Sequence, residues 1–227
     1  MAKPARTRMP ASRHAPALAA LTACDARLAE IIARIGPYQP NPPGDGFAAL
    51  VRAIIAQQVS KYAADAIQAR LYALFEDGVP DAARMLLLKT RKLRAVGLSA
   101  RKVEYLHDLA RHVIDGRLDF AELAHLPDEE VIERLTAVKG IGRWTAEMYL
   151  LFTLGRPDVL PLGDAALVNA VREIYGLDAD SDHTHFGAIA EAWRPWRGIA
   201  CWYLYRSINA QRAAAQAAKA ALRGKAS

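Results

Sequence analysis

Residues 135–146 read Leu-Thr-Ala-Val-Lys-Gly-Ile-Gly-Arg-Trp-Thr-Ala, and this stretch decides the fold that we expect of the chain. An apolar helix end through Val138 meets a turn from Lys139 to Gly142, and a second helix begins at Arg143. Two glycines favour so tight a turn, because glycine accepts positive φ and lets another backbone approach closely. The N–H groups at the start of the second helix carry a partial positive charge and can bind a phosphate. The alternative is an ordinary helix–turn–helix connection with a glycine cap.

On both sides of this stretch, apolar residues recur at spacings of three and four, which is the period of an amphipathic helix. Ser60 and Ser99 precede two such segments and are expected to cap them. No segment shows the alternation of a β-strand. The pattern therefore predicts an all-α protein. The repeating positions before the hairpin include Leu28, Ile31, Ile32, Ile35, Leu50, Ile54, Ile55, Ile67, Leu71 and Leu74.

The composition limits the class of protein. A chain of 227 residues that is 52% hydrophobic can bury a core in one compact body or two small lobes. It contains no apolar run near the roughly 20 residues of a membrane span, and no secretory leader is recognisable. We expect a soluble, cytoplasmic protein with no membrane partner. Cys24 and Cys201 lie far apart and are expected to be buried, reduced thiols, which excludes a disulfide framework or a four-thiolate metal site.

The net charge of +6 comes from the two ends of the chain. Residues 1–24 carry four basic residues and residues 206–227 carry five, with no acid in either segment, so the body from 25 to 205 has a net charge of −3. Bulk charge alone therefore does not predict a nucleic-acid partner. One internal run, from Arg84 to Lys102, holds seven basic residues and no acid. It indicates either a solvated helical face or a phosphate-binding patch.

Both ends also differ from the body in pattern. Residues 1–15 are rich in proline, arginine and alanine without apolar periodicity, and are predicted to form a disordered basic arm, with a transit peptide as the alternative. Residues 16–211 form the predicted helical body. After Gln211 we expect a fraying helix end that becomes a flexible basic tail over residues 212–227.

Downstream of the hairpin, residues 158–171 read Asp-Val-Leu-Pro-Leu-Gly-Asp-Ala-Ala-Leu-Val-Asn-Ala-Val. A loop with proline and glycine leads Asp164 into a new amphipathic helix. Taken alone, Asp164 is predicted to be an N-cap that stabilises this helix by roughly 1 kcal/mol.

The glycine hairpin and the Pro-Gly-Asp loop together resemble the helix-hairpin-helix DNA glycosylase superfamily, and within it the 3-methyladenine DNA glycosylase II branch. Two further blocks match, Leu-Val-Arg-Ala-Ile-Ile-Ala-Gln-Gln-Val-Ser at 50–60 and Trp-Arg-Pro-Trp-Arg-Gly-Ile-Ala-Cys-Trp-Tyr-Leu-Tyr at 193–205. The resemblance covers about residues 46 to 206. It implies two helical lobes with the active cleft between them, and no amino-terminal β-domain of the kind that the bacterial archetype carries. The central lobe is expected at about 46–160 with the hairpin at about 131–155, and the second lobe is built from both flanks.

The activity that this resemblance implies is base excision repair. The enzyme would flip an alkylated purine, such as 3-methyladenine or 7-methylguanine, out of duplex DNA and hydrolyse its N-glycosidic bond, leaving an abasic site. The sugar becomes positively charged as that bond breaks, and the resemblance assigns the stabilising carboxylate to Asp164. Bifunctional relatives carry a lysine directly after the Gly-x-Gly-Arg turn, where this chain has Trp144. We therefore expect no lyase activity.

The resemblance also implies a substrate pocket with aromatic walls at Trp144 and Tyr205 and with Met148 as a third neighbour. A cationic alkylated purine favours such walls by roughly 0.5–2 kcal/mol. Plain core packing is the alternative for both aromatic residues. Gln58 stands where the archetype has a leucine that fills the gap left by the flipped base, and as a polar plug it can bond the orphaned partner base.

DNA-backbone contacts are expected from Lys139, Gly140, Gly142 and Thr145, with Ser60 and Lys102 as second-tier candidates. The family also implies a monovalent cation, Na⁺ or K⁺, at the main-chain carbonyls of Thr136, Val138 and Ile141. No other cofactor is expected, and the protein is expected to act as a monomer on double-stranded DNA.

Two other functions stay open. One is a non-catalytic DNA-binding module that keeps the hairpin without the chemistry. The other is a glycosylase for mismatched, oxidised or other damaged bases, because aromatic walls do not decide between alkylated purines, hypoxanthine and etheno adducts.

Overall fold

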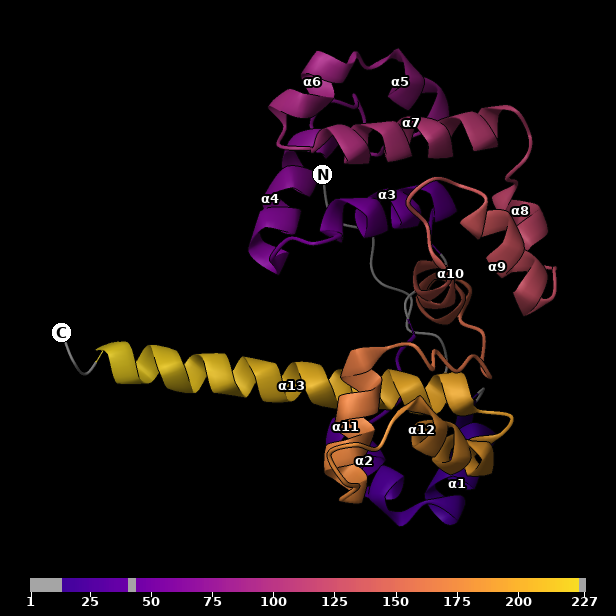
Figure 1. Ribbon diagram of the computed structural model, residues 1–227, viewed down its shortest axis with the longest axis vertical. Helices are drawn as coiled ribbons and strands as arrows, with labels where there is room; N and C mark the ends of the chain where they lie inside the picture. The colour runs from indigo at the N-terminus through magenta and orange to yellow at the C-terminus, as the bar shows by residue number, and fades with distance from the viewer. Residues whose placement is uncertain (1–13, 41–43, 225–227) are drawn as a thin grey trace. The chain divides into compact units, whose positions relative to one another are not determined.

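The computed structural model describes residues 14–40 and 44–224, and every regular element in this part of the chain is helical (Figure 1). This confirms the prediction of an all-α protein. The chain divides into a central unit, Asn41–Arg156, and a flanking unit made of Met1–Pro40 and Pro157–Ser227. The family resemblance implied a central lobe at about 46–160, four to five residues later at each boundary.

The central unit contains nine helical segments among its described residues. Side-chain N-caps start five of them, and Ser60 and Ser99 are two of these caps, as predicted. The segments are α3 (Gly46–Ala56), α4 (Lys61–Tyr72), α5 (Ala82–Leu87), α6 (Thr90–Ala95), α7 (Ala100–Ile114), α8 (Phe120–Leu123), α9 (Asp128–Thr136), α10 (Arg143–Tyr149) and the π-helix η2 (Leu150–Leu154).

The core of the central unit forms where α7 packs against α3 and α5. Ile54 of α3 and Leu106 of α7 are fully buried, and each such side chain contributes about 1.5–3 kcal/mol relative to exposure. Gly46, the first residue of α3, is needed for close packing. A Cβ at this position would lie 2.4 Å from the Phe120 ring and 2.6 Å from the Tyr149 hydroxyl. The start of α3 can therefore approach α8 and α10 only because residue 46 has no side chain.

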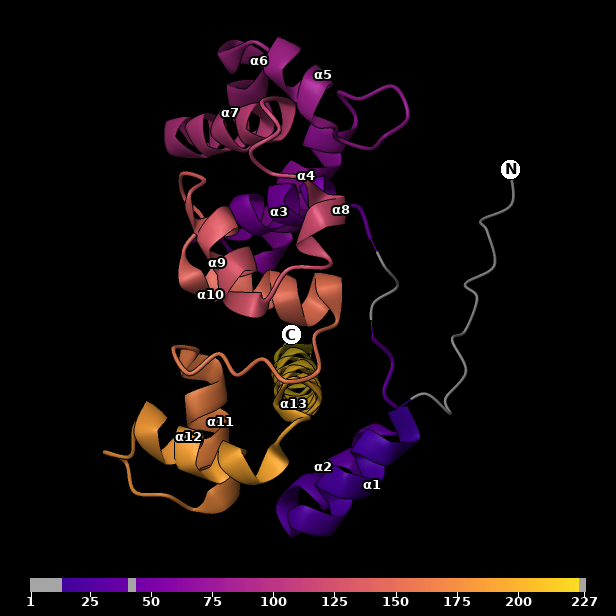
Figure 2. The same cartoon turned by 90° about the vertical axis from the view of Figure 1, so that its right-hand side faces the viewer.

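The flanking unit joins the two ends of the chain. Its elements are α1 (Ala15–Cys24), α2 (Ala26–Ile35), α11 (Ala165–Tyr175), α12 (His183–Ala190), the 3₁₀ segment η3 (Glu191–Trp193) and α13 (Arg197–Gly224). The pair α1 and α2 lies side by side, and α2 and α11 both pack against α13 (Figure 2).

Asp25, between α1 and α2, connects segments that are far apart in the sequence. Its carboxylate accepts hydrogen bonds from the Leu28 amide at 2.9 Å, the Tyr175 hydroxyl at 2.5 Å and the Trp193 indole N–H at 2.8 Å. Burial raises the pKa of Asp25, but these hydrogen bonds together lower it by more than burial raises it. The pKa of Asp25 therefore lies below its usual value. Burial, together with the same carboxylate, raises the pKa of Tyr175.

Two predictions about the ends of the chain are wrong. Cys24 is exposed, although Cys201 is buried as expected. The stretch after Gln211 does not become a flexible tail, because α13 continues without a break to Gly224 (Figure 1). Its many alanines favour helix, which outweighs the polar composition that suggested fraying. The predicted disordered arm falls mostly on residues 1–13, which lie outside the described residues, as do residues 225–227 of the predicted tail; α1 begins at Ala15. Among the described residues, no helix is both long enough and apolar enough to cross a bilayer.

Candidate active site

Asp164 stands at the entrance of α11, in the flanking unit, and both of its carboxylate oxygens accept hydrogen bonds. Oδ1 accepts the Leu167 amide at 2.8 Å, which makes Asp164 the N-cap that its sequence position predicted. Oδ2 accepts the hydroxyl of Tyr205 of α13 at 2.7 Å. The Asp164 side chain is buried, with 5% of its surface exposed. Two donors from different helices therefore set the orientation of this carboxylate.

Tyr205 was predicted as an aromatic wall of the substrate pocket. It lies half-buried in the flanking unit, and its hydroxyl donates a hydrogen bond to Asp164. Sequence reasoning did not anticipate this contact between two residues that it had selected for separate reasons.

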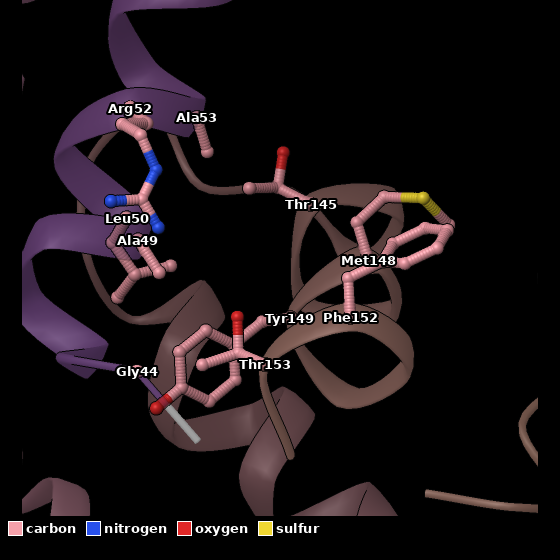
Figure 3. Close-up of a pocket in the computed structure, with 10 residues that line it drawn as sticks. All are labelled: Gly44, Ala49, Leu50, Arg52, Ala53, Thr145, Met148, Tyr149, Phe152 and Thr153. Atoms are coloured by element: carbon pink, nitrogen blue, oxygen red, sulfur yellow. The ribbon is translucent and has the colours of Figure 1, made fainter. Parts of the chain in front are cut away.

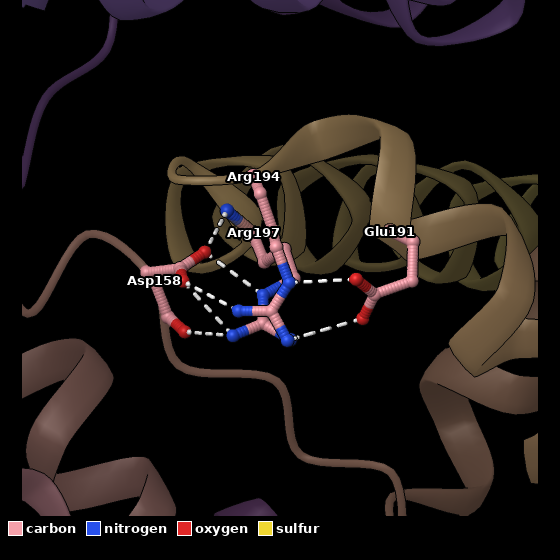
Figure 4. A network of polar contacts seen from close by, with 4 residues as sticks. All are labelled: Asp158, Glu191, Arg194 and Arg197. Carbon is pink, nitrogen blue, oxygen red and sulfur yellow. Dashed lines mark hydrogen bonds and ion pairs between the residues drawn. The ribbon is translucent and has the colours of Figure 1, made fainter.

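The loop that leads to Asp164 starts at an ion-pair network (Figure 4). Asp158 Oδ1 accepts from Arg197 Nε at 2.8 Å and Oδ2 accepts from Arg197 Nη2 at 2.9 Å, while Arg194 reaches Oδ2 at 3.2 Å. Glu191 pairs with both arginines. Burial raises the pKa of Asp158, but the hydrogen bonds from Arg197 and the nearby positive charges outweigh it and hold the pKa below its usual value. The network keeps Asp158 ionised at neutral pH.

The hairpin of the central unit lies where it was predicted, but its first helix ends two residues before the predicted end at Val138. α9 ends at Thr136, residues 137–142 turn the chain, and α10 begins at Arg143. Gly140 has a φ of +80°, and a Cβ there would lie 2.2 Å from the ring of Tyr105. Gly142 has a φ of −94°, and a Cβ there would meet nothing within 4 Å. Gly142 is also the N-cap of α10, and it has no side chain to accept the first amides of that helix.

Lys139, within the hairpin turn, is bonded to two acidic residues of α7. Its main-chain amide donates to Asp108 at 2.9 Å, and its ammonium donates to Glu104 at 2.7 Å. The hydrogen bond and the charge of Glu104 raise the pKa of Lys139. Both side chains of this ion pair are more than half exposed, so the pair contributes little to stability and a phosphate can compete with Glu104 for the ammonium.

The turn between α3 and α4 carries the predicted plug. Gln58 is exposed and has a φ of +54°, an uncommon conformation for a residue with a side chain. Such strain concentrates at functional sites. Val59 beside it is 39% exposed, and Ser60 then caps α4. The turn therefore presents Gln58 at the surface, as a gap-filling residue requires.

Lys102 does not lie where a phosphate contact was predicted. Its ammonium donates to the main-chain carbonyl of Ile55 at 2.7 Å, near the end of α3, and the residue is only 8% exposed. Burial lowers its pKa. A direct phosphate contact would require this ammonium to leave the carbonyl, so Lys102 supports the end of α3 instead.

A pocket of about 530 Å³ lies within the central unit, between α3 and the continuous pair α10–η2 (Figure 3). Met148, a predicted pocket residue, lines it, and so does Thr145, whose side chain is buried; a phosphate contact from Thr145 would therefore come from its main-chain amide. Trp144, one turn before Met148, is 49% exposed. The described lining residues are Gly44, Ala49, Leu50, Arg52, Ala53, Thr145, Met148, Tyr149, Phe152 and Thr153.

Arg52 and Phe152 are among the lining residues of this pocket that sequence reasoning missed. Arg52 is the single charged member of the described lining, and its guanidinium lies beside α3, near Leu50 and Ala49 (Figure 3). Phe152 belongs to the π-helix η2, and π-turns are frequent at functional sites. Burial and the nearby Asp45 carboxylate raise the pKa of Tyr149 to about 12, so its phenol stays neutral. The only available signal for Arg52 was its place in the matched block 50–60.

Comparison with known proteins places these features in context. The family model described as "HhH-GPD superfamily base excision DNA repair protein" matches residues 51–196. DNA-3-methyladenine glycosylase 1 of Schizosaccharomyces pombe is 34% identical over 192 residues, which cover 82% of this chain and 84% of the relative. A solved structure of the S. pombe 3-methyladenine DNA glycosylase in complex with abasic DNA superimposes with a TM-score of 0.76 at 34% identity, covering 84% of this chain and 95% of that one. A DNA-3-methyladenine glycosidase from Bacillus halodurans gives a TM-score of 0.77 at 37% identity, covering 86% and 89%.

Proposed function

The chain belongs to the HhH-GPD superfamily of base excision DNA repair proteins, and on that basis we propose that it is a monofunctional glycosylase for alkylated purines in duplex DNA. The observation that carries the proposal is the Asp164 carboxylate, held at a helix entrance by donors on both oxygens. The names of the relatives support the same substrate class. We further propose that the protein acts in the cytoplasm as a monomer.

DNA binding would begin at the hairpin. The amides at the start of α10 meet no side-chain cap at Gly142, and the open space around Gly142 lets a phosphate approach the backbone. Lys139 adds a positive charge beside this site. Gly140 supports the turn, and Thr145 and Ser60 offer further donors. Such contacts hold the DNA backbone without reading its sequence.

The monovalent cation implied by the family would be held by the main-chain oxygens of Thr136, Val138 and Ile141. Oxygen donors suit Na⁺ or K⁺, although the Val138 carbonyl already accepts the Ile141 amide at 3.1 Å and would have only its second lone pair to offer. When bound, the cation would supply positive charge for the same phosphate. The donor set contains no carboxylate, which agrees with a weak, exchangeable ion.

Extraction of the damaged base would leave a gap in the duplex. Gln58 is exposed on a strained turn and can enter this gap, where its amide both donates and accepts hydrogen bonds toward the orphaned base. The flipped base would meet Trp144 and Met148 of the central unit. A cationic alkylated purine is attracted to the exposed indole of Trp144.

Bond cleavage follows from the charge of the sugar. The C1′–N bond breaks with its electron pair going to the base, so an alkylated purine that was cationic leaves as a neutral molecule. Asp164 stabilises the positive charge that develops on the sugar. A water molecule then adds its oxygen to C1′ and loses one proton, which completes the hydrolysis. With Trp144 where the lyases have lysine, no amine is available there to attack the sugar, and the abasic strand stays intact.

The test is release of bases from defined substrates. Purified protein is incubated with duplexes that contain 7-methylguanine, 3-methyladenine, hypoxanthine or an etheno adduct, and released bases are identified by mass spectrometry. We expect release of the methylated purines, no strand nicking on a denaturing gel, and loss of release in Asp164→Asn with DNA binding retained. Binding without release by the unmodified protein would identify a DNA-binding module. Release of only the non-methylated bases would show that alkylated purines are not the substrate class. Full activity of Asp164→Asn would contradict the role of Asp164 in stabilising the sugar cation.

A further inference from the structure

The loop that delivers Asp164 is bonded to α13 at both of its ends. At the first end, three consecutive amides of the first turn of α13 find acceptors in residues 157 and 158. Gly198 and Ile199 donate to the Pro157 carbonyl at 2.7 and 3.3 Å, and Arg197 donates to Asp158 Oδ1 at 3.2 Å. The first amides of a helix have no partner inside the helix, so the loop acts as the cap of α13.

The Arg197 side chain reinforces this end. Its guanidinium donates to both carboxylate oxygens of Asp158 and also to the Asp158 main-chain carbonyl at 3.1 Å. Bidentate guanidinium–carboxylate pairs fix the relative orientation of the two groups and also strengthen the interaction. Arg197 is only 14% exposed, so this pair is less screened by solvent than the surface pairs of Arg194 and Glu191 around it (Figure 4).

The second end is the hydrogen bond from Tyr205 to Asp164. Tyr205 lies eight residues after Arg197 on the same helix, about 12 Å further along its axis. The terminal torsion of aspartate is broad, so hydrogen bonds to both oxygens restrict the carboxylate more than a bond to one oxygen does. The Tyr205 hydroxyl donates to Oδ2 at 2.7 Å, so the carboxylate is held at its second oxygen as well as at its first.

We propose that Tyr205 is a positioning residue that acts through its hydroxyl, holding the Asp164 carboxylate in one orientation for the sugar cation. This inference rests on the proposed function, because it assigns Tyr205 a task only if Asp164 stabilises the transition state. A charge stabiliser is effective when it is aligned before the reaction and needs no reorganisation during it. The role differs from that of an aromatic wall, which depends on the ring face and not on the hydroxyl.

The experiment separates the hydroxyl from the ring. Tyr205→Phe keeps the ring and removes the donor, and Tyr205→Leu removes both. Tyr203→Phe is the matched control, since Tyr203 lies two residues earlier in α13 and donates its hydroxyl to the Gly36 carbonyl at 3.0 Å, away from Asp164. Each variant is measured for melting temperature, affinity for abasic DNA and the single-turnover rate of base release from 7-methylguanine duplex, with Asp164→Asn alongside.

We expect Tyr205→Phe to lower the single-turnover rate by about 10- to 100-fold, the effect of losing one hydrogen bond to a charged group, with DNA affinity within about twofold. Tyr205→Leu should fall at least as far, and Tyr203→Phe should keep its rate whatever its melting temperature. A Tyr205→Phe variant at full rate beside an inactive Asp164→Asn would overturn the positioning role and leave the proposed function intact. Full activity of Asp164→Asn would instead overturn the proposed function itself.

Discussion

The side-chain amide of Gln57 donates a hydrogen bond of 2.7 Å to the main-chain carbonyl of Gly140. Gln57 is the C-cap of α3 and Gly140 lies in the hairpin turn, so this bond ties the turn that carries Gln58 to the segment proposed to grip the phosphate. Both turns lie in the central unit, so the bond directly links the turn of the gap-filling residue Gln58 to the hairpin turn that is proposed to bind phosphate.

Replacing Gln57 by glutamate should destabilise the protein by about 1 kcal/mol, because a carboxylate cannot donate to the Gly140 carbonyl. Gln58→Glu is the matched control: it adds the same charge one residue later, on an exposed side chain, and should change the unfolding free energy by no more than about 0.5 kcal/mol. Urea unfolding at neutral pH measures both variants. Equal losses would mean that added charge, and not the lost hydrogen bond, is responsible.

Features that depend on local sequence could be predicted. The hairpin follows from glycines at 140 and 142, the N-caps at Ser60 and Asp164 follow from residue type and position, and each agrees with the structure. Caps and turns are decided by a few neighbouring residues, so a single sequence carries enough information to place them.

Contacts between distant segments could not be predicted in the same way. Lys102 belongs to a basic run that suggested a surface patch, yet its ammonium is buried on a carbonyl 47 residues earlier in the chain. The Tyr205 hydroxyl meets Asp164 across 41 residues, and Gln57 meets Gly140 across 83. Hydropathy and charge say nothing about which donor meets which acceptor once helices pack. The sequence therefore predicted an aromatic wall at Tyr205 but not the hydrogen bond from its hydroxyl to Asp164.

The two hairpin glycines should respond differently to alanine. In Gly142→Ala the new methyl group meets open space and φ is negative, so the fold should be kept, with a change in unfolding free energy of no more than about 1 kcal/mol. A phosphate that approaches the backbone there would be blocked, and affinity for undamaged duplex should fall by about tenfold, which corresponds to roughly 1.4 kcal/mol. Fluorescence anisotropy at fixed salt measures the affinity.

Gly140→Ala is the comparison for this prediction. Its φ of +80° and the 2.2 Å approach to Tyr105 mean that alanine strains the turn and moves the ring, so we expect about 1–3 kcal/mol of destabilisation. Gly142→Ala that folds and binds DNA as the unmodified protein does would show that no phosphate approaches this part of the hairpin.

The stability contributed by Asp25 should depend on pH in the acid range. Its pKa in the folded protein is lowered from the usual value of 3.8, so its contribution is fully present above that value and is lost as the pH falls through the folded pKa. Asp25→Asn should cost about 1–3 kcal/mol at pH 7, since an amide cannot accept the same set of bonds from Tyr175 and Trp193. The difference from the unmodified protein should shrink below pH 4. Denaturant unfolding from pH 7 to pH 3 tests this, with exposed Asp65→Asn as the control; a difference that stays constant over the range would contradict it.

Trp144 should govern the preference for charged bases and not the stability of the fold. Its side chain is 49% exposed, so Trp144→Leu should change the unfolding free energy by no more than about 0.5 kcal/mol. The indole face attracts a cation by about 0.5–2 kcal/mol, which corresponds to a roughly 2- to 30-fold selectivity, whereas a neutral base gains only stacking. We therefore expect Trp144→Leu to slow release of cationic 7-methylguanine more than release of neutral hypoxanthine. The ratio of the two rates in Trp144→Phe should lie between the ratios in the unmodified protein and in Trp144→Leu. Rates measured under single-turnover conditions for both substrates give the ratio directly. An equal loss for both would leave Trp144 a shape-filling wall, because only an electrostatic attraction distinguishes a charged purine from a neutral purine of similar size.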